Sequence, residues 1–179
     1  MKKKIVDLII ILPKEDFFSH NLKILIKKLL EKGIDYKIIG EDNICESYSG
    51  DLFQCLNIKD AIKNNIYGKN IFLVGGEGYK RIIDNVLMMA YLNSYDLIKN
   101  NIFLEREAIF VFVELKKLFN KVITKITEDL DFYTQNFLVP LDEEVVVDDN
   151  LITTKKTISE KFVEEIIKKL INPKLKYRN

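Results

Sequence analysis

The sequence predicts an α/β fold in which a mostly parallel sheet lies between two layers of helices. Strand-like and helix-like segments alternate from one end of the chain to the other. The segment Ile5–Leu12 is apolar apart from Asp7, as expected of a central parallel strand that is covered on both faces. A helical apolar pattern follows, ends at Gly33 and leads into a second strand-like segment, Asp35–Ile39. This order predicts right-handed crossovers in a three-layer α/β/α sandwich of the flavodoxin-like or Rossmann-like type.

Length and charge limit the classes of protein that fit. The 179 residues are expected to form a single domain, residues 1–179. With 28 Lys and Arg against 27 Asp and Glu, the net charge of +1 gives no reason to expect nucleic acid or a membrane surface as partner. The early apolar run is broken by Asp7, so we interpret it as a buried strand rather than a signal peptide. The two cysteines cannot form a disulfide framework, which favours a cytoplasmic location.

A β-hairpin is predicted around Gly50. The segments Ile44–Tyr48 and Leu52–Leu56 flank residues of turn-forming type. With the turn centred on Gly50, Cys45 and Cys55 would face each other across the two strands. We favour two buried thiols in a reducing compartment over a redox pair.

The middle of the chain continues the alternation. We expect a helix at Ile58–Asn65, a strand at Asn70–Val74, a glycine-rich loop at 75–78 and a long helix at 82–91. Two further strands are expected at Ile102–Leu104 and Lys121–Ile126. The segment Ala108–Val113 fits either a strand or a buried helix. The glycine-rich loop is suited to anion capture by backbone amides, but its spacing is neither GxGxxG nor GxxxxGK, so we do not favour a nucleotide site.

The last part of the chain combines a hairpin and a helix. Glu144–Val147 and Leu151–Thr154 bracket a turn. Thr157 lies three residues before Glu160, which predicts a capping box at the start of an amphipathic helix. Pro173 is expected to end that helix.

Three stretches carry a resemblance to a known family. The first is FLVGGEGYKRIIDN, Phe72–Asn85, in which a strand ends in a Gly-Gly pair before a helix. The second is VVVDDNLITTKKTISEKFVEEIIKKL, Val145–Leu170. The third is the opening strand followed by LPKEDFF and a helix that ends at a glycine. Together, in order and spacing over nearly the whole chain, they resemble the ThiJ/PfpI family of the class I glutamine amidotransferase-like superfamily. This family includes intracellular proteases and glyoxalase- and deglycase-type enzymes.

The resemblance implies a catalytic thiolate that this chain lacks. In active members a cysteine lies in a sharp turn from strand to helix, because the thiolate is the attacking species. The resemblance places that position at Glu105 or Arg106, and neither is a cysteine. The acidic position of the first loop falls near Asn21, and the histidine position falls near Lys125. The resemblance therefore implies a degenerate site in which the thiolate mechanism cannot run.

Other features of the family site are retained or replaced. Gly75 and Gly76 occupy the loop whose backbone N–H groups stabilise the oxyanion in active members. The Gly-Pro that often follows the closing strand is replaced by Lys155-Lys156-Thr157. The only histidine, His20, is expected to be solvated or to take part in capping.

A charged cluster is the remaining candidate for a site. Glu105, Arg106, Glu107 and Lys125 are expected to gather where the family pocket lies, either as a new site for a small anion or acid–base chemistry or as a salt-bridged plug. We favour the plug. No metal or cofactor is expected, since one histidine and two distant cysteines cannot supply a closed zinc site.

The sequence therefore predicts a non-catalytic ThiJ/PfpI-like protein that acts by binding a small molecule or another protein, as a homodimer by resemblance. The alternative is a hydrolase, deglycase or thiazole-phosphate-biosynthesis type of enzyme that uses residues other than cysteine. A flavodoxin-like cofactor binder is a third hypothesis, and it predicts a yellow protein.

Overall fold

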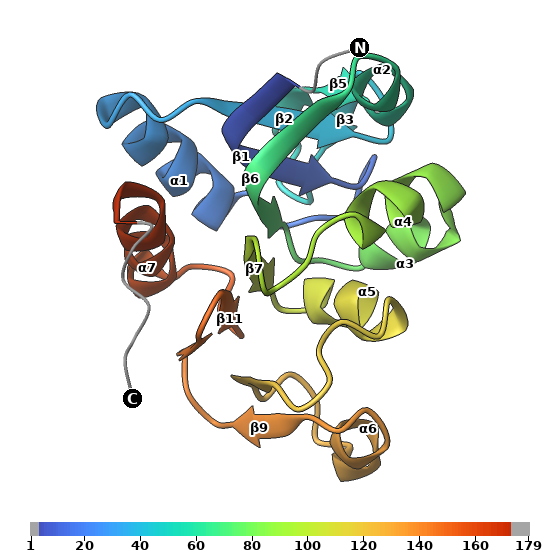
Figure 1. Ribbon diagram of the computed structural model, residues 1–179, viewed down its shortest axis with the longest axis vertical. Helices are drawn as coiled ribbons and strands as arrows, with labels where there is room; N and C mark the ends of the chain where they lie inside the picture. Colours follow the sequence, from blue (N-terminus) through green and yellow to red (C-terminus); the bar gives the residue numbers. More distant parts are fainter. Residues whose placement is uncertain (1–3, 173–179) are drawn as a thin grey trace.

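A seven-stranded sheet forms the middle of the fold (Figure 1). The computed structural model describes residues 4–172. The strands, in spatial order, are β10 (Val145–Asp148), β11 (Leu151–Thr154), β7 (Asn101–Glu105), β6 (Ile66–Leu73), β1 (Lys4–Leu12), β2 (Tyr36–Gly40) and β5 (Leu56–Asn57). Neighbouring strands are parallel except for the hairpin of β10 and β11. The predicted mostly parallel sheet is confirmed.

Helices cover both faces of this sheet (Figure 1). On one face lie α1 (His20–Glu31) and α7 (Glu160–Ile171), and on the other lie α2 (Ile58–Lys63), α3 (Tyr79–Asp84), α4 (Val86–Asn93) and α5 (Ala108–Glu114). The ambiguous segment at 108–113 is thus helical. Gly33 has φ 63 just beyond α1, which confirms it as the glycine that ends that helix. Within residues 4–172, no helix is long and apolar enough to cross a membrane.

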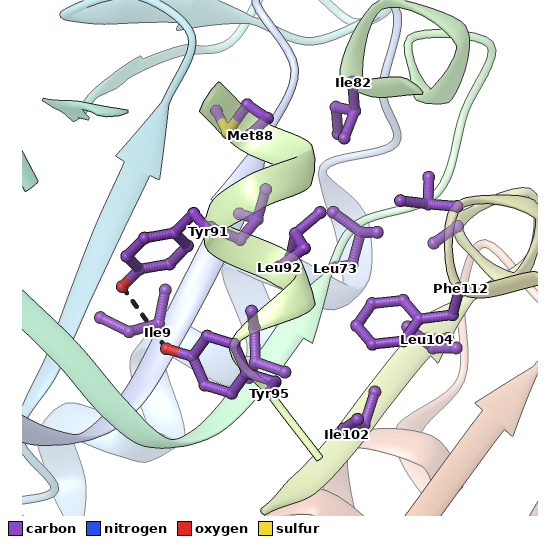
Figure 2. Packing of buried hydrophobic residues seen from close by; sticks show 14 of the residues in the cluster. Ile9, Leu73, Ile82, Met88, Tyr91, Leu92, Tyr95, Ile102, Leu104 and Phe112 are labelled. Carbon is purple, nitrogen blue, oxygen red and sulfur yellow. Dashed lines mark hydrogen bonds between the residues drawn. The ribbon is translucent and has the colours of Figure 1, made fainter. Parts of the chain in front are cut away.

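The core is divided between the two faces of the sheet. Along β1, Ile9 and Ile11 join the cluster under α4 and α5, whereas Ile10 joins the cluster under α1 and α7. Figure 2 shows the first cluster, in which the hydroxyls of Tyr91 and Tyr95 lie 3.4 Å apart. β1 therefore contributes side chains to the core on both faces of the sheet. Full burial of each large apolar side chain stabilises the fold by about 1.5–3 kcal/mol.

The first hairpin has a different register from the predicted one. Its strands, β3 (Ile44–Glu46) and β4 (Leu52–Gln54), place Cys45 opposite Phe53 rather than opposite Cys55. Backbone hydrogen bonds within residues 47–51 close the loop around Ser49, one position earlier than the sequence suggested. The expected cross-strand pairing of the cysteines is therefore wrong. Both cysteines are free and buried, as expected.

Two helix boundaries also differ from those that the sequence predicts. The long helix expected over 82–91 is divided at Asn85, whose side chain accepts hydrogen bonds from the backbone N–H groups of Leu87 and Met88 and so caps α4. At α7 the cap is Ser159, whose hydroxyl accepts a hydrogen bond from Phe162 N–H. The capping box predicted at Thr157 is wrong because the helix begins at Glu160. Pro173 lies outside the described residues.

A small substructure beside the sheet was only partly predicted. The expected strand at 121–126 is present as β8 (Val122–Thr124), but it pairs in parallel with β9 (Val139–Leu141) in a separate two-stranded sheet. Between them lies α6 (Leu130–Gln135), capped by the side chain of Asp129. Neither β9 nor α6 was predicted, because their short segments carry no clear periodicity.

Candidate functional site

A sharp turn from strand to helix forms the centre of the candidate site. β7 ends at Glu105 and α5 begins at Ala108. Between them Arg106 has φ 47, in the left-handed region that non-glycine residues rarely occupy. Its N–H donates to the carbonyl of Thr154 at 2.7 Å, which extends the edge shared with β11. Of the two positions that the sequence left open, Arg106 is the residue whose backbone makes the turn.

Glu105 points into the protein rather than into a pocket. Its side chain is fully buried, and its carboxyl oxygens accept hydrogen bonds from the Asn21 amide at 2.7 Å and from Gly75 N–H at 3.0 Å. Burial raises the pKa of Glu105 to about 8, and the two hydrogen bonds lower it only in part. The carboxyl is therefore mostly neutral at pH 7.

Asn21 connects three segments at this point. Besides Glu105 on β7, its amide donates to the carbonyl of Lys156 at 3.0 Å, and its oxygen accepts from Ser159 N–H at 2.7 Å. The structure thus brings Asn21, Glu105 and Gly75 together as the sequence implied, but it joins them in one buried network. His20, beside Asn21, begins α1 and is exposed.

The glycine loop packs closely against neighbouring backbone. A Cβ atom at Gly75 would lie 2.5 Å from the carbonyl oxygen of Glu105. Gly76 has φ 134, and a Cβ atom there would lie 2.3 Å from the carbonyl oxygen of Asp16. These close approaches require glycine at both positions. The Gly75 N–H is already engaged by Glu105, so it does not point to an open oxyanion position.

A cavity of ≈ 200 Å³ lies outside the turn, lined by Arg106, Glu107, Lys125, Ile126 and Lys155. The Arg106 guanidinium donates to the Glu107 carboxylate at 2.8 Å. The central carbon of the guanidinium, Cζ, also lies 5.2 Å from the centre of the Phe18 ring. These charged side chains border an open space, whereas the sequence favoured a salt-bridged plug that fills it.

The two lysines of this cavity have carboxylate partners on the solvent side. Lys125 pairs with Glu128 at 2.5 Å, and Lys155 pairs with Asp142. The lysine side chains are 28% and 27% exposed, whereas the carboxylates are 91% and 80% exposed. The hydrogen bond to Glu128 raises the pKa of Lys125, so its ammonium stays charged at neutral pH. Ion pairs with such exposed partners are weak and can be exchanged for another anion.

Sequence reasoning missed some neighbours of the turn. Phe18 packs against Tyr48 with ring centres 5.1 Å apart, and the Tyr48 hydroxyl accepts a hydrogen bond from Glu77 N–H at 2.9 Å. Lys155 was noted only as a replacement for Gly-Pro, although it lines the cavity. The order of elements could have indicated Lys155, since it follows β11 beside the end of β7. No sequence signal pointed to Phe18 or Tyr48.

Comparisons with known proteins identify the fold. No protein-family model and no curated protein matches the sequence. A ThiJ/PfpI domain protein from Brachyspira murdochii matches in structure with a TM-score of 0.77 at 15% identity, over 93% of this chain and 96% of that one. Drosophila melanogaster DJ-1beta matches with a TM-score of 0.75 at 17% sequence identity, over 94% of this chain and 91% of that one. A cysteine-to-alanine mutant of a DJ-1 superfamily protein from Salmonella typhimurium matches with a TM-score of 0.75 at 18% sequence identity, over 94% of this chain and 89% of that one. The chain has the ThiJ/PfpI fold.

Within this ThiJ/PfpI fold, the cysteines lie away from the turn at Arg106. Cys45 is on β3 and Cys55 follows β4, and both belong to the core cluster under α1 and α7. A Cβ atom on Gly40 would contact both side chains, which places them together beside β2. Neither cysteine lines the cavity outside the turn. Among residues 4–172, no group of three or more His, Cys, Asp or Glu side chains could hold a metal ion.

Proposed function

We propose that this chain is a ThiJ/PfpI family protein without the thiolate mechanism, and that it binds a small anionic molecule beside Arg106. One observation carries the proposal: three cationic side chains, Arg106, Lys125 and Lys155, line one cavity at the turn between β7 and α5. The resemblance of the sequence puts the nucleophile of active members at this turn. A cation cannot replace a thiolate there, because its charge attracts an anion and it carries no electron pair for attack.

The charges around the cavity support an anionic ligand. The Arg106 guanidinium donates from Nε and Nη2 to Glu107 and from Nη1 to the Lys155 carbonyl, which leaves one further N–H on each of Nη1 and Nη2 for a carboxylate or a phosphate. Glu107 balances part of the Arg106 charge, while the carboxylates that pair with Lys125 and Lys155 are largely in solvent. A ligand anion would exchange with these exposed carboxylates and gain two ammonium contacts. Glu105 faces the interior and leaves the cavity free of a second buried negative charge.

Titration with small anions tests the proposal. Malonate, succinate and inorganic phosphate would be added to ¹⁵N-labelled protein while amide shifts are followed. We expect saturable shifts around residues 106, 125 and 155 for at least one of these anions, weakening as salt is raised. Arg106→Gly removes the guanidinium at a position whose φ suits glycine, so it should abolish binding while the turn is kept. Lys125→Ala and Lys155→Ala should each weaken binding about tenfold.

A matched control separates local from general charge effects. Lys161 is exposed on α7 and does not line the cavity, so Lys161→Ala should bind as the wild type does. If no anion produces shifts at the cavity, or if Arg106→Gly binds as well as the wild type, the binding proposal is wrong.

Enzyme assays test the non-catalytic part. The purified protein would be assayed for methylglyoxal consumption and small-amide hydrolysis, and again with Cys45→Ser and Cys55→Ser combined. We expect no turnover in either form. Turnover that persists without the cysteines and disappears in Arg106→Gly would establish the alternative, an enzyme using residues other than cysteine.

As part of the same proposal, the chain forms a homodimer, which the resemblance to the ThiJ/PfpI family supports. Sedimentation equilibrium would measure the mass in solution. Twice the chain mass of 21.0 kDa is expected, and a monomer over the micromolar range would contradict this part.

A further inference from the structure

A second cavity lies at the other end of α5, between the residues that end and follow that helix and the end of α6. Its volume is ≈ 290 Å³, and it shares no residue with the cavity at Arg106. Apolar side chains form its walls and three polar residues complete its lining: Val113, Leu118, Phe119, Phe137, Lys116, Gln135 and Asn136. A volume near the lower end of small-molecule pockets suits a ligand of one or two rings and excludes a folded partner segment.

Two aromatic rings of this cavity are exposed to solvent. Phe119 and Phe137 are 60% and 58% exposed, and their ring centres lie 4.8 Å apart in a tilted arrangement. Such a pair leaves a large apolar area in water, and a flat apolar ligand would cover it. Their position beside a cavity distinguishes them from single apolar residues scattered on a surface, which are ordinary in proteins.

The backbone holds these side chains in an uncommon conformation. Phe137 has φ 54 just after α6, and Lys116 has φ 55 just after α5. Glycine is the usual residue at a position that ends a helix in this way, and a bulky aromatic residue there is strained. The carbonyl of Phe137 accepts a hydrogen bond from Asn120 N–H at 2.9 Å, which ties the loop after α5 to the end of α6. A strained aromatic residue kept exposed at a cavity indicates a use for its ring.

Charge complementarity defines the rest of the ligand. Lys116 is exposed and, among residues 4–172, its side chain makes no ion pair. An unpaired ammonium beside apolar walls favours a molecule with a flat apolar body and one negative group. We propose that this cavity binds a small aromatic carboxylate, with its ring against Phe119 and Phe137 and its carboxylate at Lys116. This proposal does not depend on the function proposed for the cavity at Arg106.

The test uses 2-naphthoate as the probe. It would be titrated into the full chain while binding is followed by calorimetry and by amide shifts. We expect shifts confined to residues 113–120 and 135–137. Lys116→Ala should weaken the binding of 2-naphthoate about tenfold, and the neutral analogue 2-naphthalenemethanol should bind the wild type about tenfold more weakly than the acid. The neighbouring Lys117 does not line the cavity, so Lys117→Ala serves as the matched control.

Phe137→Gly separates a loss of binding from a loss of fold. Glycine accepts φ 54 without strain, so this variant should unfold at the same temperature as the wild type or higher, while its affinity for 2-naphthoate falls at least tenfold. Equal affinity in Phe137→Gly, or equal affinity of the acid and the alcohol for the wild type, would overturn the proposal. So would sedimentation showing that Phe137→Gly disperses an assembly of the wild type, because a second copy would then cover the rings.

Discussion

The side-chain amide of Asn21 donates a 2.7 Å hydrogen bond to the carboxyl group of Glu105, although the two residues are 84 positions apart. Both side chains are fully buried. Asn21 also binds the backbone of Lys156 and Ser159, so a single amide joins α1, the end of β7 and the start of α7. The network fixes the strand end from which the Arg106 turn departs, and its contribution to stability can be measured.

The first prediction concerns the pH dependence that Glu105 gives to stability. Its pKa is about 8 in the folded protein and near 4.5 in an unfolded chain. Between these values the folded state holds a proton that the unfolded state has released. The contribution of this group to the free energy of unfolding therefore falls by on the order of a few kcal/mol as pH rises from about 4.5 to about 8. Above pH 8 the contribution stays constant.

Glu105→Gln removes this titration. At pH 5 the variant should be less stable than the wild type by about 1–3 kcal/mol, because an amide nitrogen cannot accept one of the two hydrogen bonds. The deficit should shrink or reverse as pH approaches 8, where the wild type buries a carboxylate. Urea unfolding at pH 5, 6.5 and 8 measures the difference, and a deficit that stays constant with pH would contradict the raised pKa.

Asn21→Ala should destabilise the protein by about 2–4 kcal/mol. The change leaves Ser159 N–H and one oxygen of Glu105 buried without a partner. Asn64→Ala is the matched control, since Asn64 donates its hydrogen bond to the Asp60 carbonyl at an exposed site and should cost less than 1 kcal/mol. Equal losses for the two variants in urea unfolding would show that the buried network adds nothing.

Much of the fold could be predicted because its signals are local. The apolar run of β1, the glycine that ends α1 and the hairpin of β10 and β11 each follow from residues close together in the sequence. The register of the first hairpin could not be predicted, because it depends on which backbone groups within residues 47–51 close the loop. β9 was missed because it is three residues long and pairs only with β8.

The candidate site was predicted only in outline. The order of elements places Arg106 and Lys125 near each other, and both line the cavity. The direction of Glu105 could not be predicted, since a glutamate next to an arginine normally suggests a solvated charge. Its burial depends on Asn21 in a distant helix and on a backbone N–H of the glycine loop.

The start of α7 provides a third prediction. Ser159 is 2% exposed, and its hydroxyl accepts from Phe162 N–H at 3.1 Å and donates to Glu144. Ser159→Ala should therefore destabilise the protein by about 1–2 kcal/mol. Thr157→Ala, at the position that the sequence pattern favoured, should change stability by less than about 0.5 kcal/mol. Thermal unfolding compares the two, and a larger effect at Thr157 would restore the predicted capping box.

The last prediction concerns the thiols, on which the non-catalytic proposal depends. Cys45 is 0% exposed and Cys55 is 8% exposed, so 5,5′-dithiobis(2-nitrobenzoate) should react slowly with the native protein and rapidly with both thiols in urea. Arg106→Cys should add one thiol that reacts rapidly in the native state, because the Arg106 side chain is 36% exposed at the turn. Thiol release followed at 412 nm measures both rates. A rapidly reacting thiol in the native wild type would mean that a cysteine reaches the surface, and chemistry through sulfur would again have to be considered for this protein.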